Sequence, residues 1–296
     1  MAERVFHIGA AQHLAPALEA GLHITATPIG NLGDITLRAL ATLAAADVVL
    51  CEDTRVSSRL MERYGIKASM KPYHEHNAEA VRPAIIAALH AGGAYALISD
   101  AGVPLVSDPG YRLVRACIEE NIKVHSLPGA SSTLTALTLS GLPSDAFTFI
   151  GFLPQREKAR RDMLMRFKDM PSTLIAFESP HRVIDALGDI NAIFQNRNMA
   201  LCRELTKLHE EVVRGSAAEI RAVLEKRESV KGEIVLVIGP ASDEVEGVTD
   251  DQIETAISAA LQDHSSAKAA SLVAKEFGLA KEDIYARILR RKADDK

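Results

Sequence analysis

The first half of the chain alternates short apolar runs with segments of helical spacing, and this alternation constrains the fold more than any other feature. Four runs have the length of buried strands: residues 22–27, 47–51, 94–98 and 123–127. Helical spacing marks residues 35–45, after a candidate N-cap at Asp34, and then residues 78–90, 111–120 and those from 131 onward. Strands and helices in this order predict a mostly parallel sheet covered on both faces, here a lobe over residues 22–143.

The second half of the chain first contains further apolar, strand-like runs and then a region without them. A turn at residues 141–145 introduces a second α/β lobe over residues 144–240. Its expected strands are residues 147–151, 173–177, 199–202 and 233–238. A short acidic linker, residues 241–248, leads to a helical module over residues 249–296, with helices expected at 250–261, 267–277 and 281–292. Residues 1–21 lack a signal-peptide pattern and are expected to be a loose, Ala-rich lead-in that need not be ordered.

Composition narrows the class of protein. Hydrophobic residues make up 47% of the chain and charged residues 25%, so both lobes can bury full cores. No run of eighteen apolar residues lacks charge, which predicts no membrane span. The three cysteines have neither zinc spacing nor a disulfide framework, so we expect no metal and a cytoplasmic location. The net charge of −5 argues against nonspecific coating of nucleic acid but allows a local basic face.

Four turns that follow the expected strands are rich in Gly, Pro, Asp and Ser: residues 27–34, 52–55, 99–104 and 128–132. The ends of parallel strands meet at one edge of a sheet, and ligands of open α/β sheets bind there. Taken singly, each turn is explained by the Gly and Pro residues that any strand-to-helix connection uses. The loop over residues 99–108 is longer than such a connection needs, which favours a functional role. Neither G-x-G-x-x-G nor a P-loop lysine motif occurs, which disfavours NAD and ATP as ligands.

Eight short motifs, in a fixed order, carry a resemblance to a known family. They are Thr-Pro-Ile-Gly-Asn at 27–31, Glu-Asp-Thr-Arg at 52–55, Tyr-His-Glu-His-Asn at 73–77, Ser-Asp-Ala-Gly-Val-Pro at 99–104, Pro-Gly-Ala-Ser at 128–131, Gly-Phe-Leu-Pro at 151–154, Glu-Ser-Pro-His-Arg at 178–182 and Arg-Glu-Leu-Thr-Lys at 203–207. Over residues 22–239 the chain resembles the tetrapyrrole methylase superfamily, and within it the family that methylates the 2′-oxygen of a cytidine in the decoding region of small-subunit ribosomal RNA. Its C-terminal helices resemble the helix-turn-helix extension of part of that family.

The resemblance implies two α/β lobes of tetrapyrrole-methylase type with a cofactor cleft between them, plus a small all-helical, helix-turn-helix-like module at the C-terminus. It implies S-adenosyl-L-methionine as the cofactor, with these residues around it: Pro28, Gly30, Asp100, Ala101, Gly102, Val103, Pro104, Ser131, Ser132, Phe177 and Leu205. Exposed N–H groups where a helix begins suit the carboxylate of the cofactor. The implied partners are 16S ribosomal RNA or the small ribosomal subunit, and a second copy of the chain in a homodimer.

Methylation of a ribose hydroxyl requires a group that takes up or polarises its proton, because the hydroxyl is a weak nucleophile. The candidates for this catalytic role are Glu52, Asp53, His74, His76 and Lys207, with Asp100 a further carboxylate. In an extended segment His74 and His76 lie on the same side, and imidazole accepts a proton near neutral pH. The same histidines could instead cap the following helix or face a dimer partner, and two histidines without further ligands do not make a zinc site.

Two basic segments are candidates for contact with RNA. Residues 155–168 hold six basic residues against two acidic ones, and residues 281–292 hold five against two. The RNA-binding candidates are Arg55, Arg156, Lys158, Arg160, Arg161, His181, Arg182, Arg287, Arg290 and Arg291. Arginine matches the geometry of phosphate. Each candidate has an alternative explanation. A run of charges is also typical of a solvated helix face, and Arg55 can equally form an ion pair with residues 52–53. The three C-terminal helices can instead pack against a second copy of the chain in a dimer.

Three other functions agree with parts of the sequence. A methylase of a small macrocycle such as a corrin precursor would need the same cofactor lobe but neither basic segment. A non-catalytic ribosome-binding factor could keep the cofactor as a structural ligand, and a DNA-binding regulator could use the C-terminal helices. The basic segments and the helical module favour ribosomal RNA as the substrate.

Overall fold

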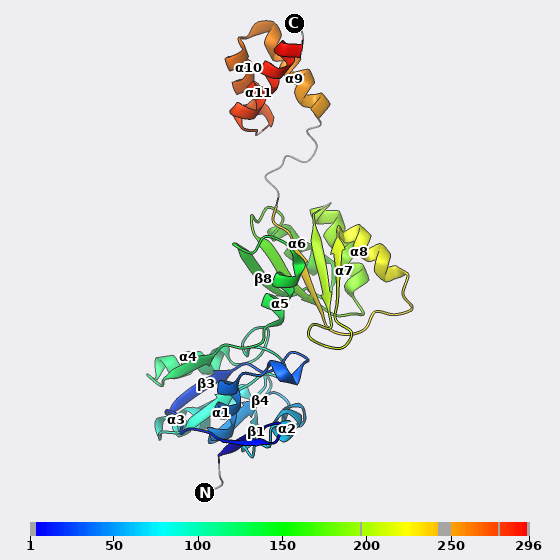
Figure 1. Cartoon of the computed structure of the whole chain (residues 1–296). Coiled ribbons are helices and arrows are strands. Elements are labelled where there is room, and N and C mark those ends of the chain that lie inside the picture. Colours follow the sequence, from blue (N-terminus) through cyan, green and yellow to red (C-terminus); the bar gives the residue numbers. More distant parts are fainter. Residues whose placement is uncertain (1–3, 196, 242–249, 278, 295–296) are drawn as a thin grey trace. The chain divides into compact units, whose positions relative to one another are not determined.

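The computed structural model describes residues 4–195, 197–241, 250–277 and 279–294 (Figure 1). The chain divides into two compact units, one that ends at Ala241 and one that follows it. The described residues of the first unit form two five-stranded sheets and a two-stranded hairpin, whereas those of the second unit are helical.

The first sheet consists of five strands in the order β5-β4-β6-β3-β7. The strands are β3 Gly21–Thr25, β4 Val48–Cys51, β5 Met70–Pro72, β6 Ala94–Leu97 and β7 Val124–Leu127. Every pairing between neighbours is parallel, which confirms the prediction of a parallel sheet. The sheet therefore brings the loops that follow its strands to one edge. The pattern of apolar runs does not reveal the short β5, whose residues are partly or fully exposed.

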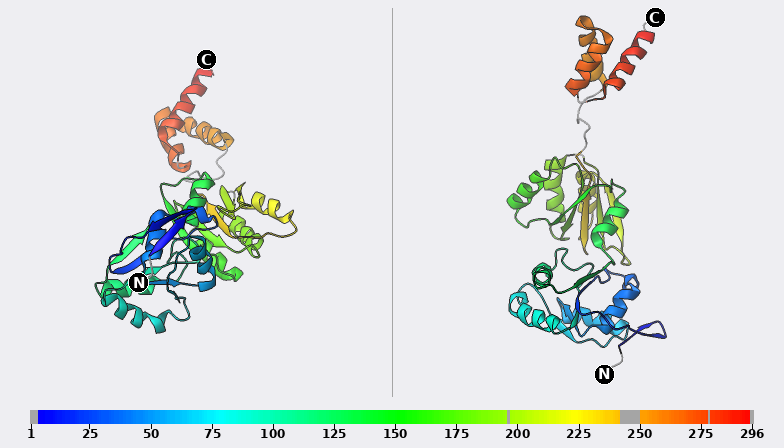
Figure 2. Two further views of the ribbon diagram at one scale, coloured as in Figure 1. Left: turned by 60° about the horizontal axis from the view of Figure 1, so that its bottom comes forward. Right: turned by 90° about the vertical axis from the view of Figure 1, so that its left-hand side faces the viewer.

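Helices cover both faces of this sheet (Figure 2). They are α1 Leu37–Ala45, α2 Thr54–Arg63, α3 Ala78–His90 and α4 Tyr111–Glu119. Successive residues of a strand point to opposite faces. Val49 accordingly packs in a core with residues of α1 and α2, whereas Val48 and Leu50 pack in a second core with residues of α3 and α4.

Helix α1 begins later than the sequence indicated. The hydroxyl of Thr36 caps it by accepting a hydrogen bond from the N–H of Ala39 at 3.0 Å. The prediction of Asp34 as the cap is wrong, because Asp34 ends a separate 3₁₀ turn, η1 Leu32–Asp34. This turn is capped in its own right by Asn31, whose side chain accepts from the N–H of Gly33.

Residues 4–20 are more ordered than the loose lead-in that the sequence indicated. Strands β1 Val5–Ile8 and β2 Ala11–Leu14 form an antiparallel hairpin. Phe6 is 6% exposed and joins the core that α1 and α2 share. The N–H of His7 donates a hydrogen bond to the carbonyl of Tyr64 at 2.8 Å. Burial of one aromatic side chain thus attaches to the first lobe a segment whose composition gave no sign of order.

The second sheet has the order β11-β10-β12-β9-β8. Its strands are β8 Phe147–Phe152, β9 Thr173–Glu178, β10 Met199–Arg203, β11 Glu211–Gly215 and β12 Ile234–Ile238. The pairing of β8 with β9 is parallel, and the other three pairings are antiparallel. Residues of α6 Glu157–Arg166, α7 Val183–Phe194 and α8 Ala217–Glu225 pack on this sheet in one large core.

Helix α5 Ser132–Ser140 follows the last strand of the first sheet but packs on the second sheet. Ala136 and Leu137 share a core with Ile175, Ala200 and Val235, which belong to β9, β10 and β12. Figure 1 shows α5 against the strands of the second sheet. The lobe boundary predicted at residue 143 lies just after α5, yet the core contacts of α5 already belong to the second lobe.

The described residues of the second unit form three helices, α9 Asp250–Asp263, α10 Ser266–Phe277 and α11 Lys281–Asp294. Ile257, Val273 and Ile284 are at most 1% exposed and pack in one small core. These bounds agree closely with the three expected helices, whereas residues 242–248 of the expected linker lie outside the described residues. None of the helices in the described ranges is both long enough and apolar enough to span a bilayer.

A buried ion pair joins α6 to α7. The Arg160 guanidinium and the Asp189 carboxylate lie 2.7 Å apart, and their side chains are 5% and 8% exposed. Arg160 also donates hydrogen bonds to the carbonyls of Pro154 and Gln155, at 3.4 and 3.3 Å. Loss of either partner would leave the other charge buried and unpaired, so the pair fixes α6 against α7.

Replacement of Asp189 by alanine should lower the free energy of unfolding by about 3–5 kcal/mol, since Arg160 would remain buried without its partner. The matched control is Asp185→Ala, one turn earlier on α7 at an exposed position, which should cost less than about 1 kcal/mol. Urea denaturation followed by circular dichroism measures both values. Equal losses for the two variants would contradict the importance of the pair.

Candidate functional site

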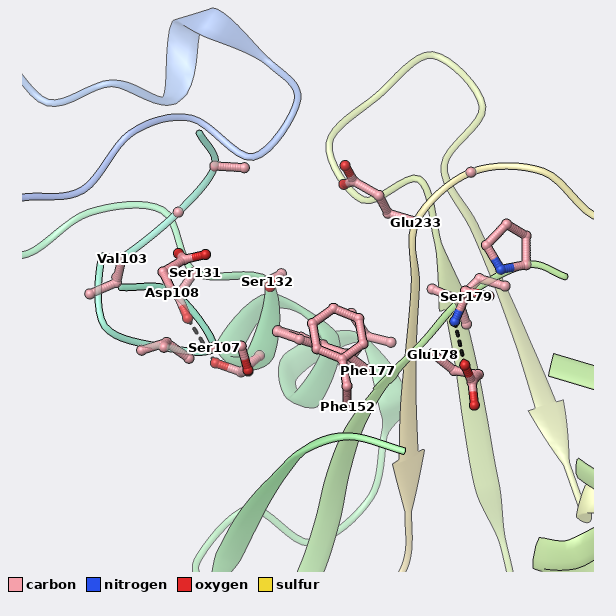
Figure 3. A pocket seen from close by; sticks show the side chains of 18 residues that line it. Val103, Ser107, Asp108, Ser131, Ser132, Phe152, Phe177, Glu178, Ser179 and Glu233 are labelled. Carbon is pink, nitrogen blue, oxygen red and sulfur yellow. Dashed lines mark hydrogen bonds between the residues drawn. The ribbon is translucent and has the colours of Figure 1, made fainter. Parts of the chain in front are cut away.

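A cavity of about 330 Å³ lies where the loops of the first sheet face the second sheet (Figure 3). It is lined by residues 101–103, 106–108 and 131–133 of the first lobe and by Phe152, residues 177–180 and residues 232–235 of the second. The first group follows β6 and β7, so the cavity occupies the edge of the sheet at which the sequence predicts a ligand. Its size is within the range of small-molecule sites, about 300–1,000 Å³.

The loop that follows β6 is held in one shape by hydrogen bonds. Thr27 and Gly102 exchange two backbone hydrogen bonds, at 2.9 and 3.0 Å, in an antiparallel bridge. The hydroxyl of Thr27 donates to the carbonyl of Ser99 at 3.1 Å. The Ser99 hydroxyl in turn donates to the carbonyls of Ala101 and Gly102 at 3.2 Å. The turn after β3 therefore fixes the part of this loop that lines the cavity.

The same loop stores backbone strain. Leu105 and Ser107 have φ values of 74° and 64°, in the left-handed region that side chains other than glycine rarely adopt. Each such residue costs on the order of 1–3 kcal/mol and persists only where surrounding contacts fix it. Strain of this kind gathers at functional sites, and here Ser107 lies in the wall of the cavity.

The N-terminus of α5 forms another part of the wall. Ser131 caps the helix: its hydroxyl accepts from the N–H of Leu134 at 3.4 Å and lies 2.9 Å from the hydroxyl of Thr133. The first N–H groups of a helix lack partners within the helix, and its dipole makes this end positive. This wall therefore suits the carboxylate of a ligand.

Aromatic side chains form the opposite wall. The rings of Phe152 and Phe177 lie 5.2 Å apart at an interplanar angle of 65°, and Phe149 makes a similar edge contact with Phe177 at 4.9 Å. Figure 3 shows Phe152 and Phe177 together, across from Asp108 and Ser131. Phe152 is 55% exposed, so its ring is available to a ligand or to a macromolecule that covers the cavity.

Three carboxylates meet beside the cavity. Burial and then the charge of Glu52 raise the pKa of Asp108 to about 6; a hydrogen bond with Ser99 opposes them, and the charge of Asp100 adds a smaller increase. Burial also raises the pKa of Asp100, whose Oδ1 accepts from the N–H of Asp53 at 3.3 Å. Mutual repulsion of such groups favours a bound cation or a bound proton.

Glu178 at the end of β9 is almost fully buried at the edge of the cavity. It accepts a hydrogen bond from the N–H of Ser179 at 2.6 Å and lies 2.6 Å from the guanidinium of Arg182. Burial raises its pKa despite these partners. One carboxylate oxygen of Glu178 and Nη1 of Arg182 are buried without a hydrogen-bond partner. The motif at residues 178–182 therefore contains an internal ion pair with spare hydrogen-bonding capacity.

An adjoining hollow of about 480 Å³ lies at the ends of β4 and β5. It is lined by Glu52, Asp53, Thr54, Arg55, Pro72, His74, His76 and Asp100. The structure thus brings together four of the five predicted catalytic candidates: Glu52, Asp53, His74 and His76. The two imidazoles lie 6.0 Å apart, and the N-cap of α3 is Asn77 rather than either histidine.

Arg55 and Lys207 are held in ion pairs. Arg55 donates to Asp53 at 2.6 Å, and these hydrogen bonds lower the pKa of that carboxyl to about 2. Lys207 lies 2.9 Å from Glu204 and 3.2 Å from Glu233. Lys207 lines neither the cavity nor the hollow, but its partner Glu233 lines the cavity.

Six of the predicted cofactor residues line the cavity: Ala101, Gly102, Val103, Ser131, Ser132 and Phe177. Asp100 lines the adjoining hollow instead, and Pro28, Gly30, Pro104 and Leu205 line neither space. Leu205 is 5% exposed because it packs in the core between α5 and the second sheet. Gly30 packs against the neighbouring segment, where an added Cβ would lie 2.5 Å from Cγ of Lys207.

Of the second-lobe wall, only Phe177 was predicted from the sequence to line the site, and the last part of the long loop was not assigned to it. The lining residues that were not predicted to hold the cofactor are Val106, Ser107, Asp108, Thr133, Phe152, Glu178, Ser179, Pro180 and residues 232–235. The motifs at 151–154 and 178–182 contain Phe152 and Glu178 to Pro180, so these could have been found. Residues 232–235 begin an apolar strand and carry no motif.

The basic residues predicted to contact RNA differ in exposure. Exposed side chains are those of Arg55, Arg156, Lys158, Arg161, His181, Arg290 and Arg291. Arg160 is buried against Asp189, so its assignment to an RNA surface is wrong. Arg182 is 24% exposed and paired with Glu178, and Arg287 is partly buried. The sequence shows that this helix is basic, but it does not show which of its arginines will be buried in an ion pair with a carboxylate far along the chain.

Comparison with known families identifies both parts of the chain. The family described as Tetrapyrrole (Corrin/Porphyrin) Methylases matches residues 21–221, and the RsmI C-terminal HTH domain matches residues 247–292. Ribosomal RNA small subunit methyltransferase I of Mesorhizobium japonicum is 48% identical over 286 residues, which cover 96% of this chain and 97% of that protein. The protein of the same name from Haemophilus influenzae is 42% identical over 268 residues, covering 89% and 94%.

Solved structures share the fold. Uroporphyrin-III C-methyltransferase from Thermus thermophilus, in complex with S-adenyl homocysteine, aligns with a TM-score of 0.51 at 18% identity, covering 74% of this chain and 97% of that chain. Diphthine synthase aligns with a TM-score of 0.59 at 14% identity, covering 74% and 89%. These likenesses confirm the expected tetrapyrrole-methylase fold.

Replacement of Gly110 by alanine should lower the free energy of unfolding by about 2–3 kcal/mol. Gly110 has a φ of 137°, and an added Cβ would lie 2.9 Å from Cδ2 of Leu97 and 3.1 Å from Cδ1 of Leu105. The matched control is Gly141→Ala, where φ is 74° but no atom lies within 4 Å, with a cost of about 1 kcal/mol. Urea denaturation compares them, and a smaller loss for Gly110→Ala would show that the loop is not tightly held.

Proposed function

This chain belongs to the tetrapyrrole methylase family, in the group named ribosomal RNA small subunit methyltransferase I, and from this premise we propose that it methylates small-subunit ribosomal RNA with S-adenosylmethionine. The proposed target is the 2′-oxygen of a cytidine ribose in the decoding region of 16S ribosomal RNA. The observation that carries the proposal is the likeness of nearly the whole chain to relatives of that one name. The cavity described above supports it as the place of the cofactor.

The cavity fits the chemistry of this cofactor, which combines a purine, a carboxylate and positive charge on an amino group and a sulfur atom. Phe152 and Phe177 offer an aromatic wall on which a purine can pack. The N–H groups where α5 begins offer donors to the carboxylate. Glu233 and the carboxylates around Asp108 give the cavity a negative potential that suits a cation.

When bound, the cofactor supplies a methyl group that a positively charged sulfur activates. The chain itself contributes alignment, because displacement at carbon requires the acceptor oxygen to approach opposite the leaving group. Fixed alignment of this kind can remove about 7–11 kcal/mol of barrier. The hydrogen-bonded loop at residues 99–103 and the capped start of α5 are the ordered elements that hold reactants in place.

Helix α6 offers the positive charge that an RNA substrate requires. Its exposed cations, with those that flank it, are Arg156, Lys158, Arg161, Arg166 and Lys168. The helix begins five residues after Phe152, which lines the cavity, so few residues separate this basic surface from the cavity wall. Contacts of such cations with phosphate supply much of the affinity for RNA and weaken as salt increases. The exposed Arg290 and Arg291 offer a second basic surface within the helical unit.

A methylase of a corrin or porphyrin precursor is the alternative, because several proteins of this fold carry such names. These proteins are 18–20% identical to this chain, which shows a shared fold alone. Relatives named for ribosomal RNA are 41–48% identical and favour RNA as the substrate. The assembled small subunit as substrate, a homodimer and a cytoplasmic location stay predictions.

Purified protein should transfer one labelled methyl group from S-adenosylmethionine to 16S RNA in small subunits from a strain that lacks the gene. The label should be on a cytidine 2′-oxygen, which makes the adjacent phosphodiester resistant to alkali. Subunits from a strain that carries the gene are the control and should accept none. Absence of label in the RNA, or label on a base, would contradict the proposed function.

A further inference from the structure

Asp108 lies in the wall of the cavity, near two residues that line the hollow. It lines the cavity, and two carboxylates of the adjoining hollow, Glu52 and Asp100, are near enough to influence its charge. Figure 3 shows Asp108 beside Val103 and Ser131, on the first-lobe side of the cavity. The preceding residue, Ser107, is in left-handed backbone. A strained segment therefore holds this carboxylate in the cavity wall, near the carboxylates of the hollow.

The charged groups around Asp108 are mainly acidic. Glu52 follows β4 and Asp100 follows β6, while Glu178 and Glu233 line the cavity from the second lobe. His74 and His76 line the hollow, as does Arg55, which is paired with Asp53. None of the described residues that line the cavity is a lysine or an arginine. The surroundings therefore leave Asp108 without a cation from the cavity wall to hold its charge.

These surroundings suit Asp108 for proton transfer. Burial, with the charges of Glu52 and Asp100, raises its pKa to about 6. An ordinary aspartate has a pKa near 3.9, so Asp108 is a stronger base by roughly a hundredfold. It is still ionised near pH 7.5, and a base is most useful when its pKa lies close to the working pH.

We propose that Asp108 is the catalytic base that accepts the proton of the acceptor hydroxyl, which reaches it from the hollow. This assignment rests on the proposed methylation of a ribose hydroxyl. The proton moves from the hydroxyl to the Asp108 carboxylate as the oxygen forms its bond to the methyl carbon. The bond between that carbon and sulfur breaks, and its electron pair stays on sulfur. The proton then passes to water, which restores the carboxylate.

The histidines are less well placed for this step. His74 and His76 line the hollow but not the cavity, whereas Asp108 lines the cavity itself. Nδ1 of His74 is buried without a hydrogen-bond partner, so that atom has no access to a substrate in the present conformation. Glu52 and Asp100 act on the reaction through Asp108, because their charges make it more basic.

Asp108→Asn keeps the shape of the side chain and removes the base. Single-turnover methylation of small subunits at saturating cofactor should be slower by about 10²–10⁴-fold at pH 8. The wild-type rate should rise tenfold per pH unit at acidic pH and level off at about pH 6 or lower, since the base acts only when ionised and the positive sulfur of the bound cofactor lowers its pKa. The variant should lose this dependence. Glu52→Gln should move it to lower pH, because removal of a negative neighbour lowers the pKa of Asp108.

Two measurements without RNA complete the test. Calorimetry with S-adenosylhomocysteine should give dissociation constants for wild type and Asp108→Asn within about threefold of each other. In protein labelled with ¹³C at aspartate carboxyls, one NMR signal should titrate near pH 6 and be missing from the variant. Asp145→Asn, at an exposed position outside both spaces, is the matched control and should behave as wild type in every assay.

The outcomes separate the two proposals. If wild type methylates the RNA and Asp108→Asn matches its rate and pH profile, the assignment of Asp108 is wrong and the proposed function stands. A loss of affinity for S-adenosylhomocysteine, with an unchanged rate at saturation, would make Asp108 a cofactor-binding residue instead. If wild type methylates no ribosomal RNA, the proposed function fails. The absence of a carboxyl that titrates near pH 6 would overturn the assignment whatever the activity.

Discussion

The site depends on one packing interaction, the burial of α5 against the second sheet. The helix follows the last strand of the first sheet, yet Ala136 and Leu137 share a core with Ile175 and Val235 of the second. Ile29, in the turn after β3, joins the same core. Because protein interiors are close-packed, this core fixes the edges of the two sheets against each other. The cavity lies between those edges, so its walls come from segments far apart in sequence.

Within this arrangement, the loop after β6 contains the features that ordinary folding rules disfavour. Leu105 and Ser107 adopt left-handed backbone, and Asp108 is a carboxylate buried near two others. Each feature costs stability, and the loop keeps them because the bridge between Thr27 and Gly102 and the core of α5 hold its neighbours. Local violations of this kind are expected where a protein uses strain and perturbed charge for function. The start of α5 supplies the opposite character, a positive helix end that suits an anionic group.

Much of the fold could be predicted from the sequence, because apolar runs and helical spacing report burial directly. The parallel sheet, the start of a helix near residue 131 and the loop at residues 99–104 follow from such local patterns. Contacts between distant segments could not be predicted. Nothing near Arg160 indicates that Asp189 will bury it, and nothing near Leu205 shows that it will pack under α5. Likewise, nothing near Asp108 indicates that Glu52, which follows another strand, will lie close enough to raise its pKa.

A crystal structure of the protein with S-adenosylhomocysteine tests the central claim most directly, namely that the cavity between the two lobes holds the cofactor. We expect the purine to pack on the wall formed by Phe152 and Phe177, and the amino-acid end to lie at the start of α5. The sulfur should then face the space between Asp108 and the adjoining hollow. Density for the ligand on another surface, or an empty cavity at saturating concentration, would contradict the account.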